Sequence, residues 1–358
     1  MHIFVSRIKS TTMADDRLDI IRRYVTTHPQ CSSTEIFEGI GQTVAYATVR
    51  RDLAKLLADD VLLVTGKGKA SRYALSPAYA LFQPVDLDGY FSQEIDERQI
   101  NETYNFDLIE STLAVASLFT KNEIERLDGL QHMFAENISK LSAAQYRKEM
   151  ERLGVDLSWK SSQIEGNTYS LLETERLLLE KETAAGKSKD EAVMLLNHKD
   201  ALDFILDNPD YLSELTVTKI ETIHSILVKE LAVDRNIRIR RVGITGANYR
   251  PLDNEFQIRE ALEQMCQVVN RKENVFEKAL LILLLISYIQ PFDDGNKRTA
   301  RIVSNALLIA NNYCPLSFRT VDSIDYKKAM LLFYEQNNLS AFKQIFIEQF
   351  AFAVKTYF

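Results

Sequence analysis

Cysteine is scarce in this chain, with only Cys31, Cys266 and Cys314 among its 358 residues. Three thiols so widely spaced supply neither a disulfide framework nor a zinc site of the usual spacing, and they are typical of a reducing compartment. Long hydrophobic runs are also missing, because the longest, Ala279 to Ile289, falls well short of the roughly 20 apolar residues that a membrane-spanning helix needs. The opening segment, Met1 to Met13, is too short and too polar for a signal peptide, so we expect a cytoplasmic protein.

Glycine and proline are few, at 12 and 7 residues, and the alternation of apolar and polar residues that marks a strand is rare. Apolar residues instead recur at helical spacing, most clearly from Glu191 to Leu206. The net charge of −7 argues against general binding to polyanions, so any contact with nucleic acid must be local. The sequence therefore predicts a mainly α protein. Similar helical patterns run through Ser170–Lys181, Leu215–Glu230, Phe256–Val269, Glu277–Ile289, Thr299–Asn311 and Asp325–Gln336.

The N-terminal part has a different pattern, with short elements separated by turns. Three short helices are predicted, at Asp15–Thr26, Ser33–Ile40 and Tyr46–Ala58, with Ser32 or Ser33 as N-cap of the second. Two strands, Val61–Val64 and Ser71–Leu75, then form a hairpin. This order resembles a winged helix-turn-helix. We expect such a domain over residues 13–78, a linker over 79–91 and one large helical domain over 92–358.

Positive charge in the winged helix gathers on the two elements that usually meet DNA. The third helix carries Arg50, Arg51 and Lys55, and the hairpin carries Lys67, Lys69 and Arg72. These residues are candidate phosphate contacts. Winged helices also dock proteins or associate with a second copy, so a DNA partner, a protein partner and a homodimer all stay open.

The most specific pattern is the run Gln-Pro-Phe-Asp-Asp-Gly-Asn-Lys-Arg at residues 290–298. Pro291 ends the apolar helix before it, and Gly295 permits a tight turn and close approach of the backbone to a ligand. The next helix then begins at Asn296, where free N–H groups and the helix dipole favour an anion. Cationic side chains crowd this helix start, namely Lys297, Arg298 and Arg301.

Cations at a helix N-terminus oppose its dipole, so three of them at one place call for an anion. Asp294 lies among them, and a carboxylate beside a phosphate cradle is a usual anchor for Mg²⁺. Phosphate, magnesium and arginine at one turn indicate a nucleoside diphosphate or triphosphate. A P-loop pattern is missing from the sequence, so the chemistry is not that of a P-loop enzyme.

The run is similar to the signature of the Fic family, H-P-F-x-[DE]-G-N-[GK]-R-x-x-R, and every informative position matches except the first. The resemblance implies a Fic-type helical domain and transfer of AMP from ATP to a hydroxyl side chain of a target protein, with Mg²⁺. It also implies roles for the matching residues: Asp294 for the metal, Gly295 and Asn296 for the anion hole, Arg298 for the β-phosphate and Arg301 for the γ-phosphate. Lys297 fills a position that is Gly or Lys in the family.

Two further segments resemble parts of the same family. Residues 161–167 are similar to its inhibitory motif, [ST]-x-x-x-E-[GN], with Ser161 and Glu165 at the defining positions. The resemblance implies that Glu165 pairs with Arg301 and blocks the γ-phosphate. Residues 240–251 resemble the family's flap, a small hairpin that holds the target by main-chain pairing, here through Ile244, Thr245 and Gly246.

The departure from the family lies at Gln290, in the position of the catalytic histidine. A glutamine amide does not titrate near neutral pH, so it cannot remove the proton from an attacking hydroxyl. Losing such a base costs on the order of 10² to 10⁴ in rate. Three accounts stay open: a natural nucleotide-binding protein with weak or no transferase activity, a substitution introduced to silence an enzyme, or a different natural chemistry.

None of the five histidines offers an evident replacement for the missing base. His198 is predicted on a helix without catalytic residue types nearby, and His224 is expected to be structural. Two functions therefore stand side by side. One is an adenylyltransferase autoinhibited through Glu165 and weakened by Gln290. The other is a nucleotide-sensing regulator or scaffold whose winged helix binds DNA or a protein.

Overall fold

A computed structural model describes residues 13–42, 44–59, 61–98 and 100–358 of the chain. The fold divides into two compact units, the first ending at Gln83 and the second spanning Pro84–Phe358. Helices dominate the described residues, with one two-stranded sheet among them, so the expected mainly α class is confirmed. The segment expected as a linker, 79–91, is largely helical, in α4 (Pro77–Phe82) and α5 (Leu87–Phe91).

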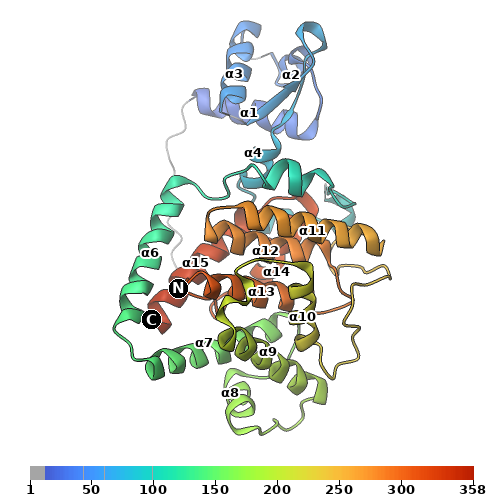
Figure 1. The fold of residues 1–358 in the computed structure, drawn as a ribbon. Helices are drawn as coiled ribbons and strands as arrows, with labels where there is room; N and C mark the ends of the chain where they lie inside the picture. Colours follow the sequence, from blue (N-terminus) through green and yellow to red (C-terminus); the bar gives the residue numbers. More distant parts are fainter. Residues whose placement is uncertain (1–12, 43, 60, 99) are drawn as a thin grey trace. The chain divides into compact units, whose positions relative to one another are not determined.

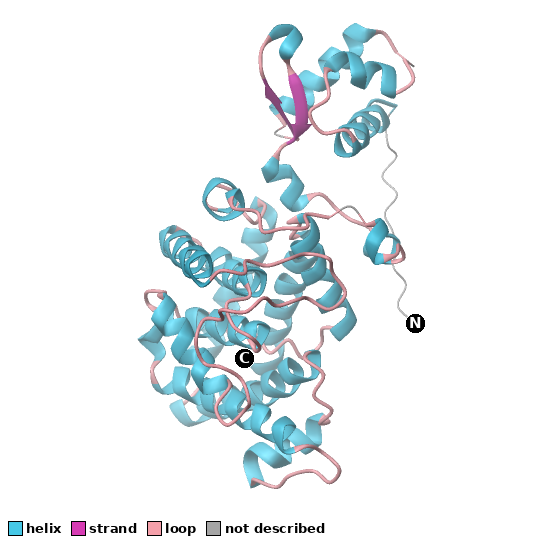
Figure 2. Ribbon diagram, turned by 90° about the vertical axis from the view of Figure 1, so that its right-hand side faces the viewer, coloured by secondary structure: helices cyan, strands magenta, loops and turns pink. Residues whose placement is uncertain are grey.

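In the first unit the elements follow the predicted order: α1 (Met13–Thr27), α2 (Ser33–Gly39), α3 (Tyr46–Ala58), β1 (Leu62–Thr65) and β2 (Arg72–Leu75). Figure 2 shows the two strands in magenta, paired antiparallel with Leu62 opposite Leu75. α2 begins with a capping box between Ser32 and Glu35, the signal that the sequence carries. A small core forms where the helices meet β1, from Ile21, Val25, Ile36, Val49, Leu53, Leu56 and Leu62. The assignment to winged helices stays a prediction.

The second unit is built around α12 (Val275–Ile289), shown in orange in Figure 1. Every side chain from Ala279 to Ile289 is fully buried, because neighbouring helices cover all sides of α12. Among the described residues no helix is both long and apolar enough to cross a membrane. The other elements are η2 (Ile95–Glu97), η3 (Leu108–Leu113), α6 (Lys121–Ser139), α7 (Ala143–Ile164), α8 (Leu171–Glu180), α9 (Lys189–Asp207), η4 (Pro209–Leu212), α10 (Val217–Leu227), α11 (Glu255–Arg271), α13 (Asn296–Ala310), α14 (Ser323–Gln336) and α15 (Ser340–Tyr357).

Both ends of α12 are set by local chemistry. Asn274 caps the first turn by accepting a hydrogen bond from the Glu277 N–H at 3.1 Å. The helix ends at Gln290, which takes a left-handed conformation with φ 53° just before Pro291. The chain then turns through residues 291–295 and begins α13 at Asn296, so the sequence pattern of residues 290–298 lies between two buried helices.

The flap segment, residues 240–251, departs from the hairpin that the sequence predicts. It turns at Thr245-Gly246, where Gly246 has φ 88° and the Ala247 N–H donates to the Ile244 carbonyl at 3.2 Å. The two arms of this turn form no strand ladder with each other in the described structure. Arg250 instead donates its N–H to the Glu102 carbonyl at 2.7 Å, and it forms an isolated parallel bridge with Thr103. The strand pairing was therefore wrong, because this arm directs a main-chain hydrogen bond outward.

Candidate functional site

The turn between α12 and α13 is organised by the side chain of Asn296. Its amide oxygen accepts from the Phe292 N–H at 2.9 Å, and its amide nitrogen donates to the Phe292 carbonyl at 2.8 Å. The same nitrogen donates to the Gln290 side-chain oxygen at 2.9 Å. Gln290 in turn donates to the Ser287 carbonyl at 2.6 Å. Both ends of the Gln290 amide are therefore engaged within the turn, which fixes its rotamer.

His224 of α10 supports the same turn from the other side. Its ring stacks on Phe292 with 3.6 Å between the ring centroids and 2° between the planes. Nε2 lies 3.0 Å from the Asp294 carbonyl, and Nδ1 lies 3.2 Å from the Arg235 carbonyl. Burial holds the pKa of His224 below its ordinary value, so the ring is neutral near pH 7 and can donate to only one carbonyl. We assign the proton to Nε2, because that contact is the shorter.

Arg238 is a site residue that the sequence did not reveal. It is buried, and its Nε donates to the Gln290 carbonyl at 2.6 Å while its backbone N–H donates to the Pro291 carbonyl at 2.9 Å. These bonds satisfy carbonyl groups at the end of α12, where no intrahelical partner exists. An arginine in a loop gives no periodic or motif signal, so only the fold could identify this role.

Arg301 is fully buried on α13 and faces Glu165, which caps the C-terminal end of α7. Its Nη2 donates to Glu165 Oε1 at 3.0 Å. Lys297 approaches Glu165 Oε2 at 3.8 Å. Burial opposes ionisation of Glu165, but the charges of Arg301 and Lys297 outweigh it and hold its pKa below the ordinary value. The pair is therefore ionised at neutral pH.

Ser161 and His198 complete the surroundings of Arg301. Nε of Arg301 donates to Ser161 Oγ at 2.8 Å, and Ser161 Oγ lies 2.7 Å from His198 Nε2. Because the arginine can only donate, the serine oxygen accepts from it, and the same hydroxyl hydrogen-bonds to the imidazole. Burial and the charge of Arg301 hold the pKa of His198 well below its ordinary value. The expectation that no catalytic residue type lies near His198 was wrong, because Ser161 is distant in sequence and close in space.

Arg298 is also buried, and its guanidinium is only partly satisfied. Nη2 donates to Asp294 Oδ2 at 2.9 Å, whereas Nε and Nη1 have no hydrogen-bond partner among the described residues. Buried guanidinium donors are costly to leave unpaired. Three cations near one helix start thus meet two carboxylates, Asp294 and Glu165, with donor capacity left over on Arg298.

A cavity of about 410 Å³ opens beside this turn. Its walls come from the α12–α13 turn, the end of α7, the flap segment and α14. The predicted site residues among its lining are Glu165, Ile244, Thr245, Gln290, Asp294, Asn296 and Lys297, and α14 adds Lys327, Met330, Leu331 and Tyr334. Arg301 does not line the cavity, because Glu165 lies against it there.

The remaining predicted residues lie around this cavity or elsewhere. Gly295 takes φ 80°, a backbone conformation that favours glycine, and Gly246 forms the flap turn. Arg50, Arg51 and Lys55 are exposed on α3 in the first unit. Among the described residues no group of three or more His, Cys, Asp or Glu side chains could hold a metal ion.

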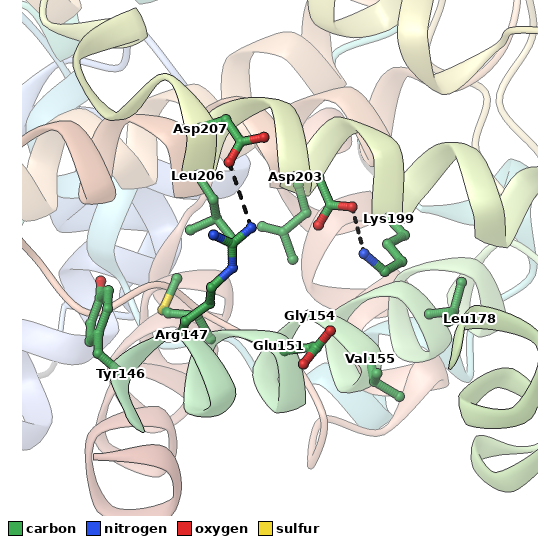
Figure 3. Close-up of a pocket in the computed structure, with 12 residues that line it drawn as sticks. Tyr146, Arg147, Glu151, Gly154, Val155, Leu178, Lys199, Asp203, Leu206 and Asp207 are labelled. Carbon is green, nitrogen blue, oxygen red and sulfur yellow. Dashed lines mark hydrogen bonds and ion pairs between the residues drawn. The ribbon is translucent and has the colours of Figure 1, made fainter. Parts of the chain in front are cut away.

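A second cavity, of about 320 Å³, lies between α7 and α9 (Figure 3). Charged residues form its rim, where Arg147 lies 3.9 Å from Asp207 and Lys199 lies 2.5 Å from Asp203. Those ion pairs are local, and none of the motif residues at 161–167, 240–251 and 290–301 lies on its walls. We therefore place the candidate chemistry in the cavity beside Asn296 rather than here.

Comparison with known proteins identifies a family domain within the second unit. Residues 211–308 match the profile of the Fic/DOC family. Protein adenylyltransferase Fic of Nematostella vectensis is 29% identical over 172 residues, which cover 47% of this chain and 40% of that protein. Protein adenylyltransferase Fic of Culex quinquefasciatus is 25% identical over 243 residues, which cover 65% of this chain and 47% of that protein. The chain thus spans less than half the length of these curated relatives.

Solved structures show the fold of the second unit. Fic-1 from C. elegans, residues 134–508, superposes with a TM-score of 0.58 at 20% identity, covering 66% of this chain and 72% of that one. A signalling protein with a Fic domain from Bacteroides thetaiotaomicron superposes with a TM-score of 0.55 at 18% identity, covering 65% of this chain and 95% of that one. The expected Fic-type helical fold is thereby confirmed.

The buried neutral histidines make stability depend on pH. A histidine whose pKa is lowered by folding contributes fully to the free energy of unfolding above its unfolded pKa of 6.5. That contribution is lost as the pH falls below 6.5. His198→Gln keeps an acceptor for Ser161, so we expect a free energy of unfolding that falls less steeply below pH 6.5. The difference in slope is up to about 1.4 kcal/mol per pH unit. Urea unfolding of the helical unit between pH 5 and 8 measures it.

The exposed His132 provides the control for this prediction. His132→Gln should leave the slope unchanged. A His198→Gln variant with the same slope as the parent would show that His198 is not buried in its neutral form.

Proposed function

We propose, from the Fic/DOC family domain that this chain carries, that its cavity binds Mg-ATP and supports transfer of AMP to a hydroxyl group of a target protein. Glu165 restrains this activity, and Gln290 weakens its chemical step. One observation carries most of the proposal: two buried guanidinium donors of Arg298 lack a partner beside a turn that ends in a free helix N-terminus. Phosphate oxygens are suitable acceptors for such donors.

The phosphate site draws on three kinds of donor. The first N–H groups of α13, starting at Asn296, have no partner within the helix. Arg298 is not among the residues that line the cavity, but it would add two buried guanidinium donors, and Lys297 adds an ammonium group on the cavity wall. A nucleoside triphosphate carries several negative charges, so it would also offset the crowding of cations at this helix start.

The metal ligand in this proposal is Asp294, and the residues present fit Mg²⁺. The Asp294 carboxylate lines the cavity, and its side chain is 60% exposed, so a hydrated cation could reach it. Mg²⁺ usually binds through one or two carboxylates plus phosphate oxygens, so it does not need a cluster of protein ligands. When bound, the ion would offset charge on the phosphates, while His224 holds the Asp294 carbonyl and keeps the turn in place.

Autoinhibition follows from the ion pair between Glu165 and Arg301. Glu165 lies between the cavity and a guanidinium that could otherwise bind a terminal phosphate. Carboxylate and phosphate compete for the same donors. Removing the carboxylate would therefore expose Arg301, with Ser161 still holding its Nε.

The weakness of the chemical step follows from Gln290. Its amide keeps the turn ordered through Asn296 and Ser287, which a binding protein needs. It has no basic lone pair near neutral pH, so it cannot remove a proton from the target's hydroxyl. Nucleotide binding would survive in this chain, and transfer would be slow.

The target's hydroxyl would approach along the flap segment. Ile244 and Thr245 line the cavity opposite the turn of residues 290–296, and Thr245 is exposed. An extended segment of a target could pair with the flap main chain while its hydroxyl points at the phosphates. The identity of the target is a separate matter from this geometry.

Glu165→Gly tests the inhibitory pair. We expect Mg-ATP to bind at least tenfold more tightly to this variant, because charge-assisted hydrogen bonds contribute about 1.5–3 kcal/mol each. Isothermal titration calorimetry with Mg-ATP and Mg-ADP measures the change. Glu182→Gly, which removes an exposed carboxylate paired with Arg176, is the control and should bind as the parent does. Absence of binding to both the parent and the Glu165 variant would reject the nucleotide site.

Gln290→His combined with Glu165→Gly tests the chemistry. Supplying a base should raise the rate of AMP transfer by about 10² to 10⁴ relative to the Glu165→Gly variant alone. Incorporation of label from α-labelled ATP, into the protein itself or into lysate proteins, measures the rate. Label from γ-labelled ATP should stay in pyrophosphate and serves as the control. If the double variant binds Mg-ATP but transfers no label, the adenylyltransferase proposal fails.

A second candidate function belongs to the first unit. Arg50, Arg51 and Lys55 on α3, with Lys67 and Lys69 near the sheet, are exposed. No ion pair joins any of them to a carboxylate among the described residues, whereas the nearby Asp52 pairs with Arg17. Exposed cations without a carboxylate partner suit contact with phosphate groups. This supports a regulator that binds DNA through α3.

Salt dependence tests DNA binding. We expect fluorescently labelled genomic fragments to bind with an affinity that falls steeply as salt rises. Replacing Arg50, Arg51 and Lys55 by glutamine should make the negative slope of log K against log salt shallower, by about 0.9 for each phosphate that the protein no longer neutralises. Lys121→Gln, Lys140→Gln and Arg147→Gln, which neutralise exposed cations of the second unit, form the control. No binding at low salt would favour protein docking instead.

A further inference from the structure

The flap turn lacks the support that a paired hairpin would provide. Its arms form no ladder with each other in the described structure, and Gly246 at its tip has φ 88°. A short turn without paired strands is marginally stable on its own. Its position beside the cavity must therefore come from contacts with other segments.

Arg98 provides the most direct of these contacts. Its Nη2 donates to the Gly246 carbonyl at 2.9 Å, so a charged donor holds the tip of the turn. Its Nη1 donates to Glu335 Oε2 at 3.2 Å. The side chains of Arg98 and Glu335 are 5% and 0% exposed, so water does not compete with the bond between them, whereas the bond to the Gly246 carbonyl is partly buried. A buried guanidinium with one carboxylate and one carbonyl as partners is tightly oriented.

Glu335 is held in place as well. The Tyr90 hydroxyl donates to its Oε2 at 2.7 Å, and Glu335 lies on α14 next to Tyr334. Tyr334, Met330 and Leu331 of the same helix line the nucleotide cavity. Leu331 also lies 3.5 Å from the position that a Cβ on Gly246 would occupy. One helix therefore contributes to the cavity wall and anchors the residue that holds the flap.

Neighbouring contacts continue the same pattern along the flap. Asn248 donates to Asp96 at 2.8 Å, and Arg250 pairs with Glu102 at 2.7 Å. Both of these contacts are exposed, so each contributes little by itself. Arg98 differs from them because its side chain is buried and its bonds are charge-assisted.

We propose that Arg98, oriented by Glu335, is the positioning residue of the flap: it fixes the main chain at Gly246 against which a target segment docks. The statement rests on the proposed function, because it assigns the flap to a target. Arg98 does not contact the cavity and takes no part in proton or phosphate chemistry. Its substitution should loosen the flap and slow transfer while nucleotide binding stays intact.

The test uses Arg98→Met combined with Glu335→Gln, so that no unpaired charge is left buried, and Tyr90 keeps an acceptor. Arg98→Lys retains one donor for the Gly246 carbonyl and is the conservative variant. Arg319→Met, which removes a different arginine from its pair with Asp156, is the matched control. All are made in the full-length chain carrying Gln290→His and Glu165→Gly, and thermal unfolding identifies any variant that does not fold.

Amide hydrogen exchange of residues 243–249 and tryptic cleavage after Arg240 and Arg241 report on the flap. In the variant with Arg98→Met and Glu335→Gln, the rates of exchange and of cleavage should both rise on the order of tenfold to a hundredfold. They should partly recover in Arg98→Lys and stay unchanged in Arg319→Met. Transfer of label from α-labelled ATP to lysate proteins should fall at least tenfold. The Kd for Mg-ATP, measured by calorimetry, should change less than twofold.

Unchanged exchange and cleavage at the flap would overturn the proposal. So would a loosened flap whose transfer rate equals that of the parent. If the parent of these variants, which carries Gln290→His and Glu165→Gly, binds Mg-ATP but transfers no label, only the proposed function fails. The exchange data would still decide whether Arg98 fixes the flap. Loss of Mg-ATP binding in the double variant would show that Arg98 acts on the cavity and would also overturn the positioning role.

Discussion

The site depends on the burial of one charge, the guanidinium of Arg301. A charge without access to water is stable only where several groups meet it, and here Glu165, Ser161 and Tyr326 do so. This requirement brings the end of α7 against the start of α13. It also draws in His198, which accepts from the Ser161 hydroxyl and must stay neutral beside the arginine. The partner that satisfies Arg301 is also the group that covers it from the cavity.

The adjoining turn obeys a second constraint, the satisfaction of main-chain carbonyls at the end of a buried helix. His224 donates to the carbonyl of Asp294, and Arg238 donates to those of Gln290 and Pro291. Asn296 closes the turn from within. These groups are neutral or have their hydrogen-bonding atoms engaged, so they fix the geometry of the turn. The capacity to bind a ligand stays with Arg298 and Asp294. Gln290 therefore keeps its contacts within the turn, although its amide cannot act as a base.

The flap and the cavity are mechanically linked through α14. This helix lines the cavity with Tyr334 and holds Arg98 with the adjacent Glu335. The segment that supplies Arg98 lies near the start of the second unit, which begins at Pro84. The cavity wall and the contact that holds the flap turn thus share one helix.

Features that depend on local chemistry could be predicted from the sequence. Apolar spacing predicted α9 and α12, the Ser32 and Glu35 pair marked the start of α2, and the composition of residues 290–298 indicated a turn suited to phosphate. Each of these depends on residues within a few positions of one another, where helix periodicity, capping and backbone preference act. The flap was expected to be a hairpin from its resemblance to the family, whereas in the described structure it is a turn whose end bonds to the Glu102 carbonyl.

Contacts between distant segments were decided by the tertiary structure alone. Ser161 meets His198, and Arg98 meets both Gly246 and Glu335, across separations that no local pattern encodes. Burial also set the charge states, since desolvation keeps His198 neutral while Arg301 keeps Glu165 ionised. The sequence by itself determined which chemical groups the site contains. Packing decided which of them face one another, because desolvation and pairing exist only once the helices have come together.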